Sequence, residues 1–431
     1  MNAFISAFIS FAIFVTSLFG SFIVVEAPED KSDFTPVLRF FAASDSHINS
    51  MGDTQAIRMQ KALKMAYAVA DSDEEYNKLD AALFAGDLTD NGQKDQFIGF
   101  NVAAKSVLRE ETELLAVIAQ SHDSSTMGKG AHPYYSSVLG EDTDIHKVIN
   151  GYHFIGISVS PNAGEHYSES QRVWLDEQLA AATAEDSTKP VFVFQHEHIT
   201  NTVYGSSDFE GWGMDYFRAV LNKYPQVVDI SGHSHYPLND PRSIWQGEFT
   251  AIGTGALYYA EFTVDDVRTY HPDGNDNVVT FWIIEVDANN RIRMRGIDLN
   301  AGDVIIEYIL DNPADPANRE YTPEKQAAKS SAPVFEEGTD IALKVRSGKY
   351  TVTVDEAKST DGMPIVLYRA FAYAEDGTLL AKTWTMPEYY IIDGEDEIVL
   401  DLGEIEAESF TVEVVAETAY GVQSAPINVS K

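Results

Sequence analysis

Short apolar runs recur along the chain, and each one stops at a polar motif that a helical pattern follows. Runs of this length predict strands, whereas apolar residues at i, i+3 and i+4 predict amphipathic helices. Alternation of the two predicts a layered α/β domain whose functional site lies at the carboxyl ends of the strands. The first three runs are residues 38–43, 81–85 and 114–119, which end at Ser44-Asp45-Ser46-His47, Gly86-Asp87 and Gln120-Ser121-His122-Asp123.

The alternation continues farther along the chain. Two histidines on alternate residues of an extended segment point to opposite sides, so we expect a turn at Gly232 that lets His233 and His235 face one point. Further strands are predicted at residues 154–158, 191–194 and 227–230, of which the last two lead to His196 and to Gly232-His233-Ser234-His235.

Helix starts and the closing segment complete this first domain. Asp53 or Thr54 begins the first helix, and Ser168 and Gln171 have the spacing of a capping box that begins a later one. The turn-rich residues 124–151 predict loops over the site. From residue 243 to 298 the pattern changes to alternating β segments, as expected if two sheets pack together.

The carboxyl-terminal part predicts a separate all-β sandwich over residues 334–431, after a linker at 312–333. Its last strands resemble those of a fibronectin type III module. The resemblance brings no catalytic motif, so a spacer or attachment module is the preferred interpretation. The expected strands are residues 341–345, 350–354, 365–373, 397–402 and 410–416.

Residues 1–27 predict either a signal peptide or an uncleaved amino-terminal anchor. Residues 4–25 are mostly apolar, and Val25-x-Ala27 has the small-residue form of a signal-peptidase site. No Lys or Arg precedes this stretch, which is also about long enough to span a bilayer. Export of a chain without cysteine indicates a bacterial protein that is secreted or held at the cell surface.

Charge and cysteine content exclude several classes of function. The formal net charge of −37 argues against nucleic acid or an anionic membrane surface as a partner. The absence of cysteine removes disulfides, thiolate metal ligands and thiol nucleophiles. The strand ends offer instead carboxylates and imidazoles, a set that suits Mn, Fe, Zn or Co better than Ca or Mg. These residues are Asp45, His47, Asp87, His122, His196, His233 and His235.

Taken in order, the motifs resemble those of the calcineurin-like metallophosphoesterase family. The family pattern is Asp-x-His, Gly-Asp-x-x-Asp, Gly-Asn-His-Asp/Glu, His and Gly-His-x-His. The resemblance runs from about Leu38 to Leu310, and it predicts a catalytic domain over residues 35–311. It implies two packed sheets flanked by helices in four layers, and a binuclear metal site that hydrolyses phosphate monoesters or diesters. The matching fragments are Asp45/His47, Gly86-Asp87-Leu88-Thr89-Asp90, Gln120-Ser121-His122-Asp123, His196 and Gly232-His233-Ser234-His235.

The resemblance also implies a role for each residue. Asp87 would bridge two divalent ions, which would generate the attacking hydroxide on a small phosphorylated substrate. His122, beside Asp123, would contact the phosphate or protonate the leaving oxygen as the catalytic acid. Asp45, His47 and His235 would hold the first ion, and His196 and His233 the second.

One departure from the family pattern concerns the second ion. Ser121 stands where the family has an asparagine ligand, and Gln120 stands where it has glycine. A hydroxyl is shorter and a poorer ligand than an amide oxygen, so the second ion is expected to bind weakly. The alternative function is therefore a catalytically weak, metallophosphoesterase-like surface binding protein.

Other residues receive structural interpretations. Asp90 is expected to cap a helix or orient His122, and Arg242 to form a salt bridge. Lining of the cleft and core packing explain Trp212, Tyr258 and Tyr259 equally well. Surface or loop positions are expected for His132, His146, His166 and His198.

Overall fold

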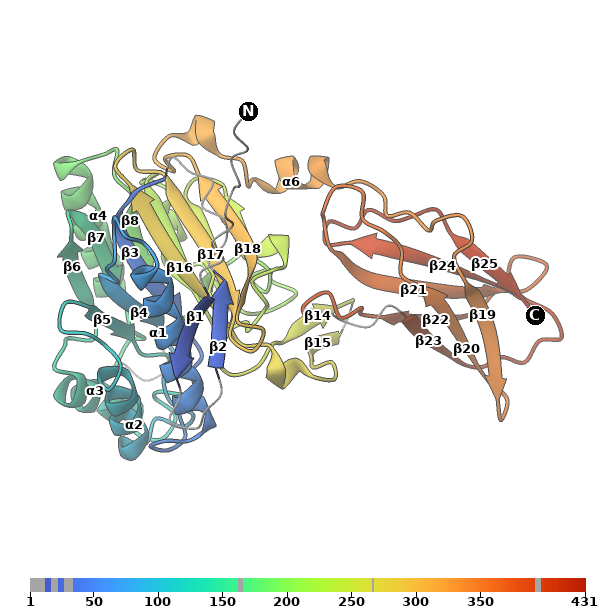
Figure 1. The fold of residues 1–431 in the computed structure, drawn as a ribbon, viewed down its shortest axis with the longest axis horizontal. Coiled ribbons are helices and arrows are strands. Elements are labelled where there is room, and N and C mark those ends of the chain that lie inside the picture. The colour runs from blue at the N-terminus through green and yellow to red at the C-terminus, as the bar shows by residue number, and fades with distance from the viewer. Residues whose placement is uncertain (1–11, 17–21, 27–33, 162–165, 266, 392–396) are drawn as a thin grey trace, which may run out of the picture. The chain divides into compact units, whose positions relative to one another are not determined.

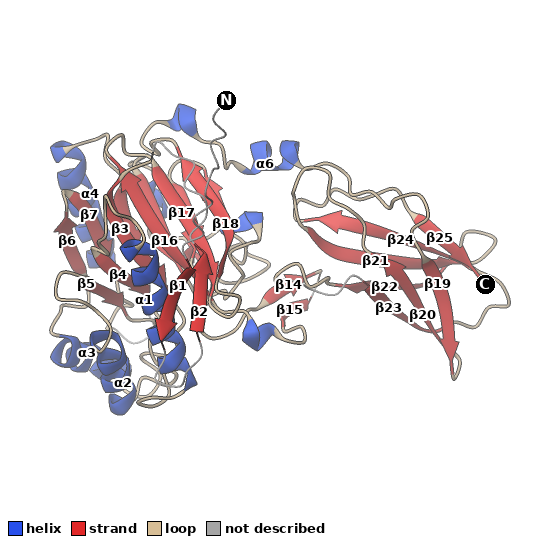
Figure 2. Ribbon diagram, in the orientation of Figure 1, coloured by secondary structure: helices blue, strands red, loops and turns tan. Residues whose placement is uncertain are grey.

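The computed structural model describes the chain apart from residues 1–11, 17–21, 27–33, 162–165, 266 and 392–396 (Figure 1). Its residues divide into two compact units. The first unit contains residues 1–239 and 243–319, and the second contains residues 240–242 and 320–431. Helices and several sheets occur together, so the predicted mixed α/β class is confirmed (Figure 2).

The first unit contains a six-stranded sheet that carries the early polar motifs. In spatial order its strands are β18 (Asp303–Leu310), β17 (Ile292–Asp298), β16 (Thr280–Asp287), β3 (Pro36–Ala43), β4 (Ala81–Ala85) and β5 (Glu113–Val117). β3, β4 and β5 are parallel, and β16, β17 and β18 extend the sheet in antiparallel fashion. Every residue of β4 is buried, as expected for a parallel strand covered on both faces.

A second six-stranded sheet carries the later histidine motifs. In spatial order its strands are β12 (Ile244–Gln246), β13 (Thr250–Gly253), β11 (Val227–Ser231), β8 (Val191–Phe194), β7 (Tyr152–Gly156) and β6 (Ile145–Ile149). β7, β8, β11 and β13 are parallel, whereas β6 and β12 pair antiparallel at the two edges.

Buried aromatic side chains join the two sheets. The Phe40 ring of β3 lies 5.1 Å from that of Phe154 in β7 and 4.8 Å from that of Phe192 in β8. The indole nitrogen of Trp282 in β16 donates a hydrogen bond of 2.7 Å to the carbonyl of Gly253 in β13. The sheets therefore share an apolar layer, with the one polar atom of Trp282 satisfied.

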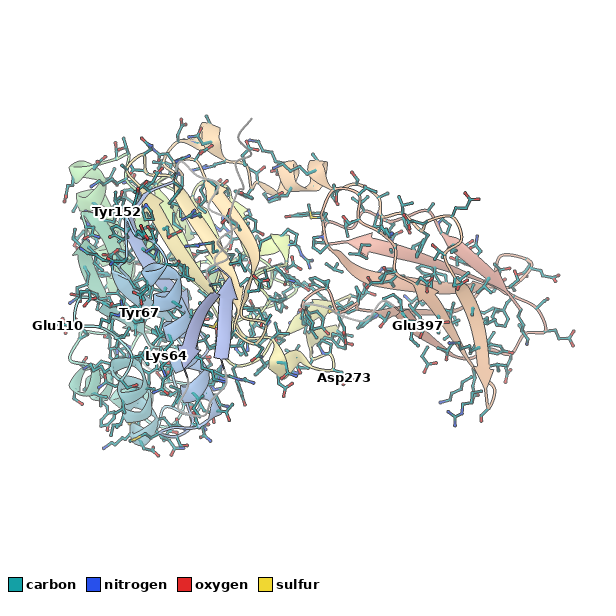
Figure 3. The ribbon with its side chains drawn as sticks, viewed as in Figure 1. Lys64, Tyr67, Glu110, Tyr152, Asp273 and Glu397 are labelled. Atoms are coloured by element: carbon teal, nitrogen blue, oxygen red, sulfur yellow. The ribbon has the colours of Figure 1, made fainter. Side chains whose placement is uncertain are left out.

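Helices cover the outer face of each sheet. α1 (Thr54–Asp71), α2 (Lys94–Lys105) and α3 (Ala131–Leu139) pack with the first sheet, and α4 (Glu169–Glu185) and α5 (Arg218–Leu221) pack with the second. Figure 1 shows α1 running along the first sheet. Figure 3 labels Lys64, which is exposed, and Tyr67, which is buried, on α1; residues 65–70 are all buried, so the second half of this helix is covered on every side.

Both predicted helix starts are confirmed. The Asp53 side chain accepts a hydrogen bond from the backbone of Ala56 and caps α1. Ser168 and Gln171 form the expected reciprocal capping box at the start of α4. These caps are local features, because side chain and backbone partners lie within one helical turn.

The expectation of loops over residues 124–151 is wrong. This segment contains a short 3₁₀ helix (Gly128–Gly130), α3 and β6. Ala131, Tyr135 and Leu139 lie four residues apart and are buried in the same core, which stabilises α3. Tyr135 also donates a hydrogen bond of 2.7 Å to the carbonyl of Ala116 at the end of β5.

Short elements complete the first unit. Two-stranded pairs are β1 (Ala12–Thr16) with β2 (Phe22–Glu26), β9 (His198–Ile199) with β10 (Gly213–Met214), and β14 (Phe262–Val264) with β15 (Val267–Tyr270). Further 3₁₀ helices are Asn275–Asn277 and Pro316–Asn318, and Pro241–Ser243 lies where the two units divide.

Most of the predicted signal or anchor segment lies outside the described residues. Among the helices that are described, none is long and apolar enough to cross a membrane.

The second unit contains two small antiparallel sheets and one short helix. The sheets are β19 (Ile341–Arg346), β20 (Lys349–Asp355) and β23 (Glu397–Glu404), and β22 (Leu379–Thr385), β21 (Ile365–Tyr373), β24 (Thr411–Thr418) and β25 (Ile427–Ser430). β22 was not among the expected strands. The helix α6 (Pro323–Lys329) lies in the segment predicted as a linker, with the Thr322 side chain as its cap.

Candidate metal centre

The predicted metal ligands all follow parallel strands at their carboxyl ends. This placement agrees with the general position of ligand sites in α/β proteins. Asp45 and His47 follow β3, Asp87 follows β4, Ser121 to Asp123 follow β5, His196 follows β8, and His233 and His235 follow β11. The two sheets thus contribute to one site.

Backbone hydrogen bonds hold these loops against one another. Asp45 N donates to the carbonyl of Gly86 at 3.0 Å, and His47 N donates to the carbonyl of Asp87 at 3.0 Å. In the second sheet, Gly232 N donates to the carbonyl of His196 at 2.9 Å. The relative positions of the side chains are therefore set by main-chain contacts between the loops.

Asp45, His47 and His235 form a first donor group. The Nε2 atom of His235 lies 3.1 Å from Asp45 Oδ1 and 3.4 Å from the Nε2 atom of His47. All three residues are buried. The structure therefore brings together the residues that the family resemblance assigns to the first ion.

Asp87, His196 and His233 form a second donor group. The Nε2 atom of His196 lies 3.1 Å from Asp87 Oδ2 and 3.0 Å from the Nδ1 atom of His233. Asp87 and His196 are buried, and His233 is partly exposed. This set is the one that the resemblance assigns to the second ion.

The two donor groups adjoin each other. His196 Nε2 is 3.9 Å from Asp45 Oδ1, and His47 Nε2 is 4.0 Å from Asp87 Oδ2. Each carboxylate therefore lies near an imidazole of the other group. This arrangement fits two neighbouring cations better than two independent sites.

Donor spacing provides a test of whether the side chains fit a metal. Ligand atoms that lie about 2.1 Å from one ion are separated from each other by about 3.0–3.4 Å. Four of the separations within the two groups are 3.0, 3.1, 3.1 and 3.4 Å between atoms that can all act as ligands, whereas His47 Nε2 and Asp45 Oδ1 lie 3.8 Å apart. Carboxylate and imidazole donors suit a divalent transition metal, so the residues fit the group that the resemblance implies.

Backbone conformation is unusual at these positions. Positive φ angles are uncommon for residues other than glycine, and they concentrate at functional sites. The turn expected after Gly232 is present, because His233 and His235 both leave the extended conformation. The positive φ angles are 52° at Asp45, 43° at His47, 47° at Asp87, 74° at His233 and 58° at His235.

Hydrogen bonds select which donor atom of Asp45 and His196 faces the site. Asp45 Oδ2 accepts hydrogen bonds from the Ser44 hydroxyl and from His233 N, which leaves Oδ1 toward the imidazoles. His196 Nδ1 lies 3.0 Å from the carbonyl of Ala85, so Nδ1 carries the proton and Nε2 is free as a ligand. Sequence reasoning did not identify Ser44, because a hydroxyl beside a motif carries no periodic signal.

The site attracts positive charge. Burial acts to raise the pKa of Asp45, but His235, His196 and His47 outweigh it and hold that pKa well below its usual range. Burial likewise opposes ionisation of Asp87, and His196 overcomes it. In the metal-free chain the protonated His196 supplies positive charge to these two buried carboxylates, and a bound metal cation would take over that role.

The imidazoles respond to the same environment. Burial lowers the pKa of His47 to about 3 and that of His233 to about 4, which keeps both rings neutral at physiological pH. Burial acts against protonation of His196 too, but the charges of Asp87 and Asp45 raise its pKa well above the usual value. Because neutral imidazole is the form that binds a metal, His196 would release a proton when a metal binds, whereas His47 and His233 are already in the binding form.

Ser121 and His122 lie at the more open side of the donor groups. Ser121 is an exposed residue, and its hydroxyl donates toward both oxygens of Asp87, at 3.2 and 3.1 Å. The His122 ring lies 4.3 Å from that of His47, and its Nδ1 is 2.6 Å from the carbonyl of Asp90. Asp90 therefore orients His122 through its backbone, one of the two roles expected for it.

Asp123 has a different position from the one its expected catalytic role requires. Its carboxylate is buried and accepts hydrogen bonds from the backbone of Leu88, Thr89 and Ala119. These contacts fasten the loop after β5 to the loop after β4. The geometry argues for Asp123 as a positioning residue instead of a catalytic one, because its oxygen atoms point into the loops.

Aromatic rings stand beside each donor group. Trp212 lies edge-on to His233 at 4.8 Å, Tyr258 lies 5.1 Å from His47, and Tyr259 lies 4.5 Å from His235. All three aromatic residues are partly exposed, so they border the site and do not belong to the interior of a core. Of the two interpretations left open by the sequence, the structure supports the first.

The four histidines that were expected at surface or loop positions separate into two kinds. His132, His146 and His166 are partly exposed, in agreement with a surface or loop position. The same expectation is wrong for His198, whose exposed fraction is 1%.

Arg242 forms the expected salt bridge, with Asp240 at 2.6 Å.

Comparison with known proteins gives one related sequence and several distant structures. No family model matches the chain. A protein of Rhodococcus erythropolis (strain PR4 / NBRC 100887) named "Probable cyclic nucleotide phosphodiesterase" is 33% identical over 109 residues. The match covers 23% of this chain and 34% of that protein, so the chain matches about a third of the relative's length.

Two solved structures are similar at low sequence identity. GAP50, the anchor in the inner membrane complex of Plasmodium, has a TM-score of 0.42 at 15% identity, with 64% of this chain and 89% of that chain covered. Purple acid phosphatase PPD1 from yellow lupin seeds has a TM-score of 0.43 at 13% identity, with 63% and 53% covered.

Proposed function

We propose that the chain is a metal-dependent phosphoester hydrolase of the calcineurin-like metallophosphoesterase type. One observation carries the proposal: two donor groups, each with one carboxylate and two imidazoles, adjoin each other at the ends of strands from two sheets. The name of the Rhodococcus relative supports a phosphoester as the substrate class. Aromatic contacts between the sheets, such as Phe40 with Phe192, support the four-layer arrangement that belongs to the same proposal.

The chain's residues divide the work between binding and proton transfer. When bound, a pair of divalent cations supplies Lewis-acid activation of water and neutralises charge on the phosphoryl group. Asp45 and His235 would hold one cation together with His47, and Asp87 would face both. Because the Nδ1 proton of His122 is committed to the carbonyl of Asp90, its Nε2 is the atom that would protonate the leaving oxygen.

The direction of substrate approach follows from exposure. Asp45, His47, Asp87 and His196 are buried, whereas Ser121 is exposed and His122 and His233 are partly exposed. A phosphate group would therefore approach from the side of Ser121 and His122. The acidic surface slows an anionic substrate, but charges farther away than about 8 Å are screened at physiological ionic strength.

Nitrophenyl phosphates test this proposal. The full chain is stripped with a chelator, loaded separately with Mn, Fe, Zn or Co, and assayed for nitrophenol release from p-nitrophenyl phosphate and bis(p-nitrophenyl) phosphate. We expect metal-dependent release, and the ratio of the two rates decides between monoester and diester chemistry. Asp87→Asn should lower the rate more than about 100-fold, because it removes a shared ligand.

Asp95→Asn is the matched control for this assay. Asp95 is an exposed residue in the first turn of α2, and the same change of charge there should leave the rate within a factor of about two. Absence of nitrophenol release with all four metals would contradict the hydrolase proposal.

A second function is favoured by the contacts of Ser121. Its hydroxyl donates toward both oxygens of Asp87 and offers a weaker ligand than the asparagine of the family pattern. A catalytically weak, metal-binding surface protein is the alternative that this substitution supports. It predicts one tightly bound ion per chain together with turnover at the background rate, which elemental analysis and the nitrophenyl assays measure in the same sample.

We also propose that the protein acts outside the cytoplasm of a bacterium, with the second unit as an attachment or spacer module of fibronectin type III-like form. The acidic net charge and the lack of cysteine support this location. Amino-terminal sequencing of the protein recovered from its host distinguishes a cleaved signal peptide from a retained anchor. Recovery of the unprocessed chain from the cytosol alone would contradict export.

A further inference from the structure

We propose that His198 is a positioning residue that holds the histidine loop, residues 231–235, so that His233 and His235 reach the two donor groups. The inference rests on the proposed metal centre but not on its catalytic activity. His198 belongs to neither donor group. Its role follows from its contacts with two side chains of the loop, one at the start of the loop and one between the two histidines.

Both ring nitrogens of His198 contact the loop. Nδ1 lies 2.8 Å from the Ser231 hydroxyl, and Nε2 lies 2.8 Å from the Ser234 hydroxyl. The imidazole therefore spans the loop from the end of β11 to the residue between the two metal-binding histidines. His198, Ser231 and Ser234 are all buried, so water does not compete for these hydrogen bonds.

The chemistry of the three groups permits this bridge without a charge. A neutral imidazole has one N–H donor and one acceptor nitrogen, and each serine hydroxyl can donate or accept. Either tautomer of His198 is therefore satisfied at both ends. An apolar side chain of similar volume would fill the space but leave two buried hydroxyl groups without this partner.

The loop needs such support because its backbone is held away from favoured conformations. His233 and His235 have φ angles of 74° and 58°, which non-glycine residues adopt only when surrounding contacts enforce them. Ser234 N donates to the carbonyl of Gly232 at 2.9 Å, which tightens the bend between the two histidines. The hydrogen bonds between the His198 ring and the side chains of Ser231 and Ser234 add a second restraint on this bend.

The opposite side of Ser234 is enclosed as well. A Cβ atom placed on Gly205 would lie 2.6 Å from the Ser234 Cβ, so the loop packs directly against the backbone of Gly205. Ser234 is thus confined between Gly205 and His198. Small displacements of this residue would move both neighbouring histidines, which belong to different donor groups.

Calorimetric titration of the metal-free full chain with Mn²⁺ tests the inference. We expect His198→Leu to weaken Mn²⁺ binding by about 10–100-fold, the range typical of residues that orient metal ligands. Ser234→Ala should also weaken Mn²⁺ binding, and it changes the side-chain volume less than His198→Leu does. The double variant should bind about as weakly as His198→Leu alone, because both changes remove the same bridge.

His146→Leu is the matched control. His146 also has both ring nitrogens in hydrogen bonds of 2.8 Å, to Gln178 and to His153, but these partners lie outside the donor groups. Its Mn²⁺ affinity should equal that of the unmodified chain within about twofold. His198→Gln, which keeps a donor and an acceptor, should recover part of the lost affinity. Thermal unfolding of each metal-free variant separates loss of folding from loss of positioning.

The possible outcomes distinguish the positioning role of His198 from the proposed metal centre. Unchanged Mn²⁺ affinity in both His198→Leu and Ser234→Ala would overturn the positioning role while the metal centre stands. Equal losses in His198→Leu and His146→Leu, with equal falls in thermal stability, would also overturn it. Failure of the unmodified chain to bind Mn²⁺ would overturn the metal centre itself, and the positioning role with it.

Discussion

Two single residues, Ser121 and Asp229, each control one property of the protein through their own side-chain chemistry. Ser121 donates its hydroxyl toward Asp87, the carboxylate that faces both donor groups. Asp229 lies inside β11, is fully buried, and accepts a hydrogen bond of 2.9 Å from the Gln195 amide through Oδ1. Ser121 affects how fully metal occupies the second donor group. Asp229 affects how the free energy of unfolding changes with pH.

Ser121→Asn should raise the occupancy of the second donor group. The longer side chain would bring an amide oxygen toward Asp87 and His196, and an amide oxygen is a better metal ligand than a hydroxyl. Elemental analysis after dialysis should give a higher metal content per chain for the variant. Ser137→Asn, at an exposed position on α3, is the control. Two tightly held ions in the unmodified chain would contradict the prediction.

Asp229→Asn should remove one contribution to the pH dependence of stability. Burial raises the pKa of Asp229 to about 7 from 3.8, while the Gln195 amide and the Arg218 charge oppose the shift. Since the folded chain then binds a proton that the unfolded chain has released, this contribution is present at acid pH and is lost between about pH 4 and 7. The asparagine mimics the protonated form at every pH.

Urea unfolding of the metal-free chains at pH 5 and pH 8 measures this effect. The free energy of unfolding of Asp229→Asn, minus that of the unmodified chain, should rise by on the order of 3 kcal/mol between the two pH values. Asp186→Asn, which changes a partly exposed aspartate after α4 whose pKa is lowered by hydrogen bonds from Thr188, should show no such rise. An equal difference at both pH values would contradict the assigned pKa.

At the scale of elements, the loops after the strands bring the site together, and glycine permits their close approach. Gly86, directly after β4, has a φ angle of 88°, and a Cβ atom there would lie 2.6 Å from His196 Nδ1. The first sheet and the second sheet therefore meet at a point where no side chain fits. A residue other than glycine would force the His196 imidazole away from Asp87.

Gly86→Ala should weaken metal binding at the second donor group. It adds a steric contact with His196 to the cost of a positive φ angle, which is about 1–2 kcal/mol for a residue with a Cβ atom. Gly52→Ala carries the same backbone cost at φ 77° with no atom within 4 Å, so it separates the two effects. Calorimetric titration with Mn²⁺ should show weaker binding in Gly86→Ala only. Equal affinities in the two variants would show that the contact is relieved without moving the imidazole.

Most elements of the first unit could be predicted, because their signals are local. Apolar runs gave β4 and β8 with their observed bounds, and a polar cap gave the start of α1. α3 and β6 were missed because their residues are polar or turn-forming and become buried only by packing against other elements. The burial of His198 could not be predicted for the same reason, because its partners Ser231 and Ser234 lie 33 and 36 residues away in the sequence.

At the scale of the molecule, the two units have separate apolar cores. Clusters of buried residues lie on the two large sheets of the first unit, and a third cluster fills the second unit. The donor groups belong entirely to the first unit. A metal that binds the folded first unit stabilises that unit by mass action, and we expect the second unit to be unaffected.

Removal of metal should affect one unfolding transition and not the other. Differential scanning calorimetry of the full chain with Mn²⁺ and with a chelator should show a lower Tm in the chelator for the transition assigned to the first unit. At a free Mn²⁺ concentration of 100 times Kd, the stabilisation expected is about 2.7 kcal/mol. The Asp87→Asn variant should lose most of this difference. A common shift of both transitions would contradict the separation.

The sequence by itself determined where strands end and which residues could bind a metal, because both depend on the local order of apolar and polar residues. The family resemblance added the division of those residues into two groups, and the tertiary structure brings the same sets together. Only the tertiary structure decided which atom of each ligand faces the site, that Asp123 fastens two loops, and that His198 is buried beneath the histidine loop. These features depend on the packing of two sheets against each other, which no local pattern encodes.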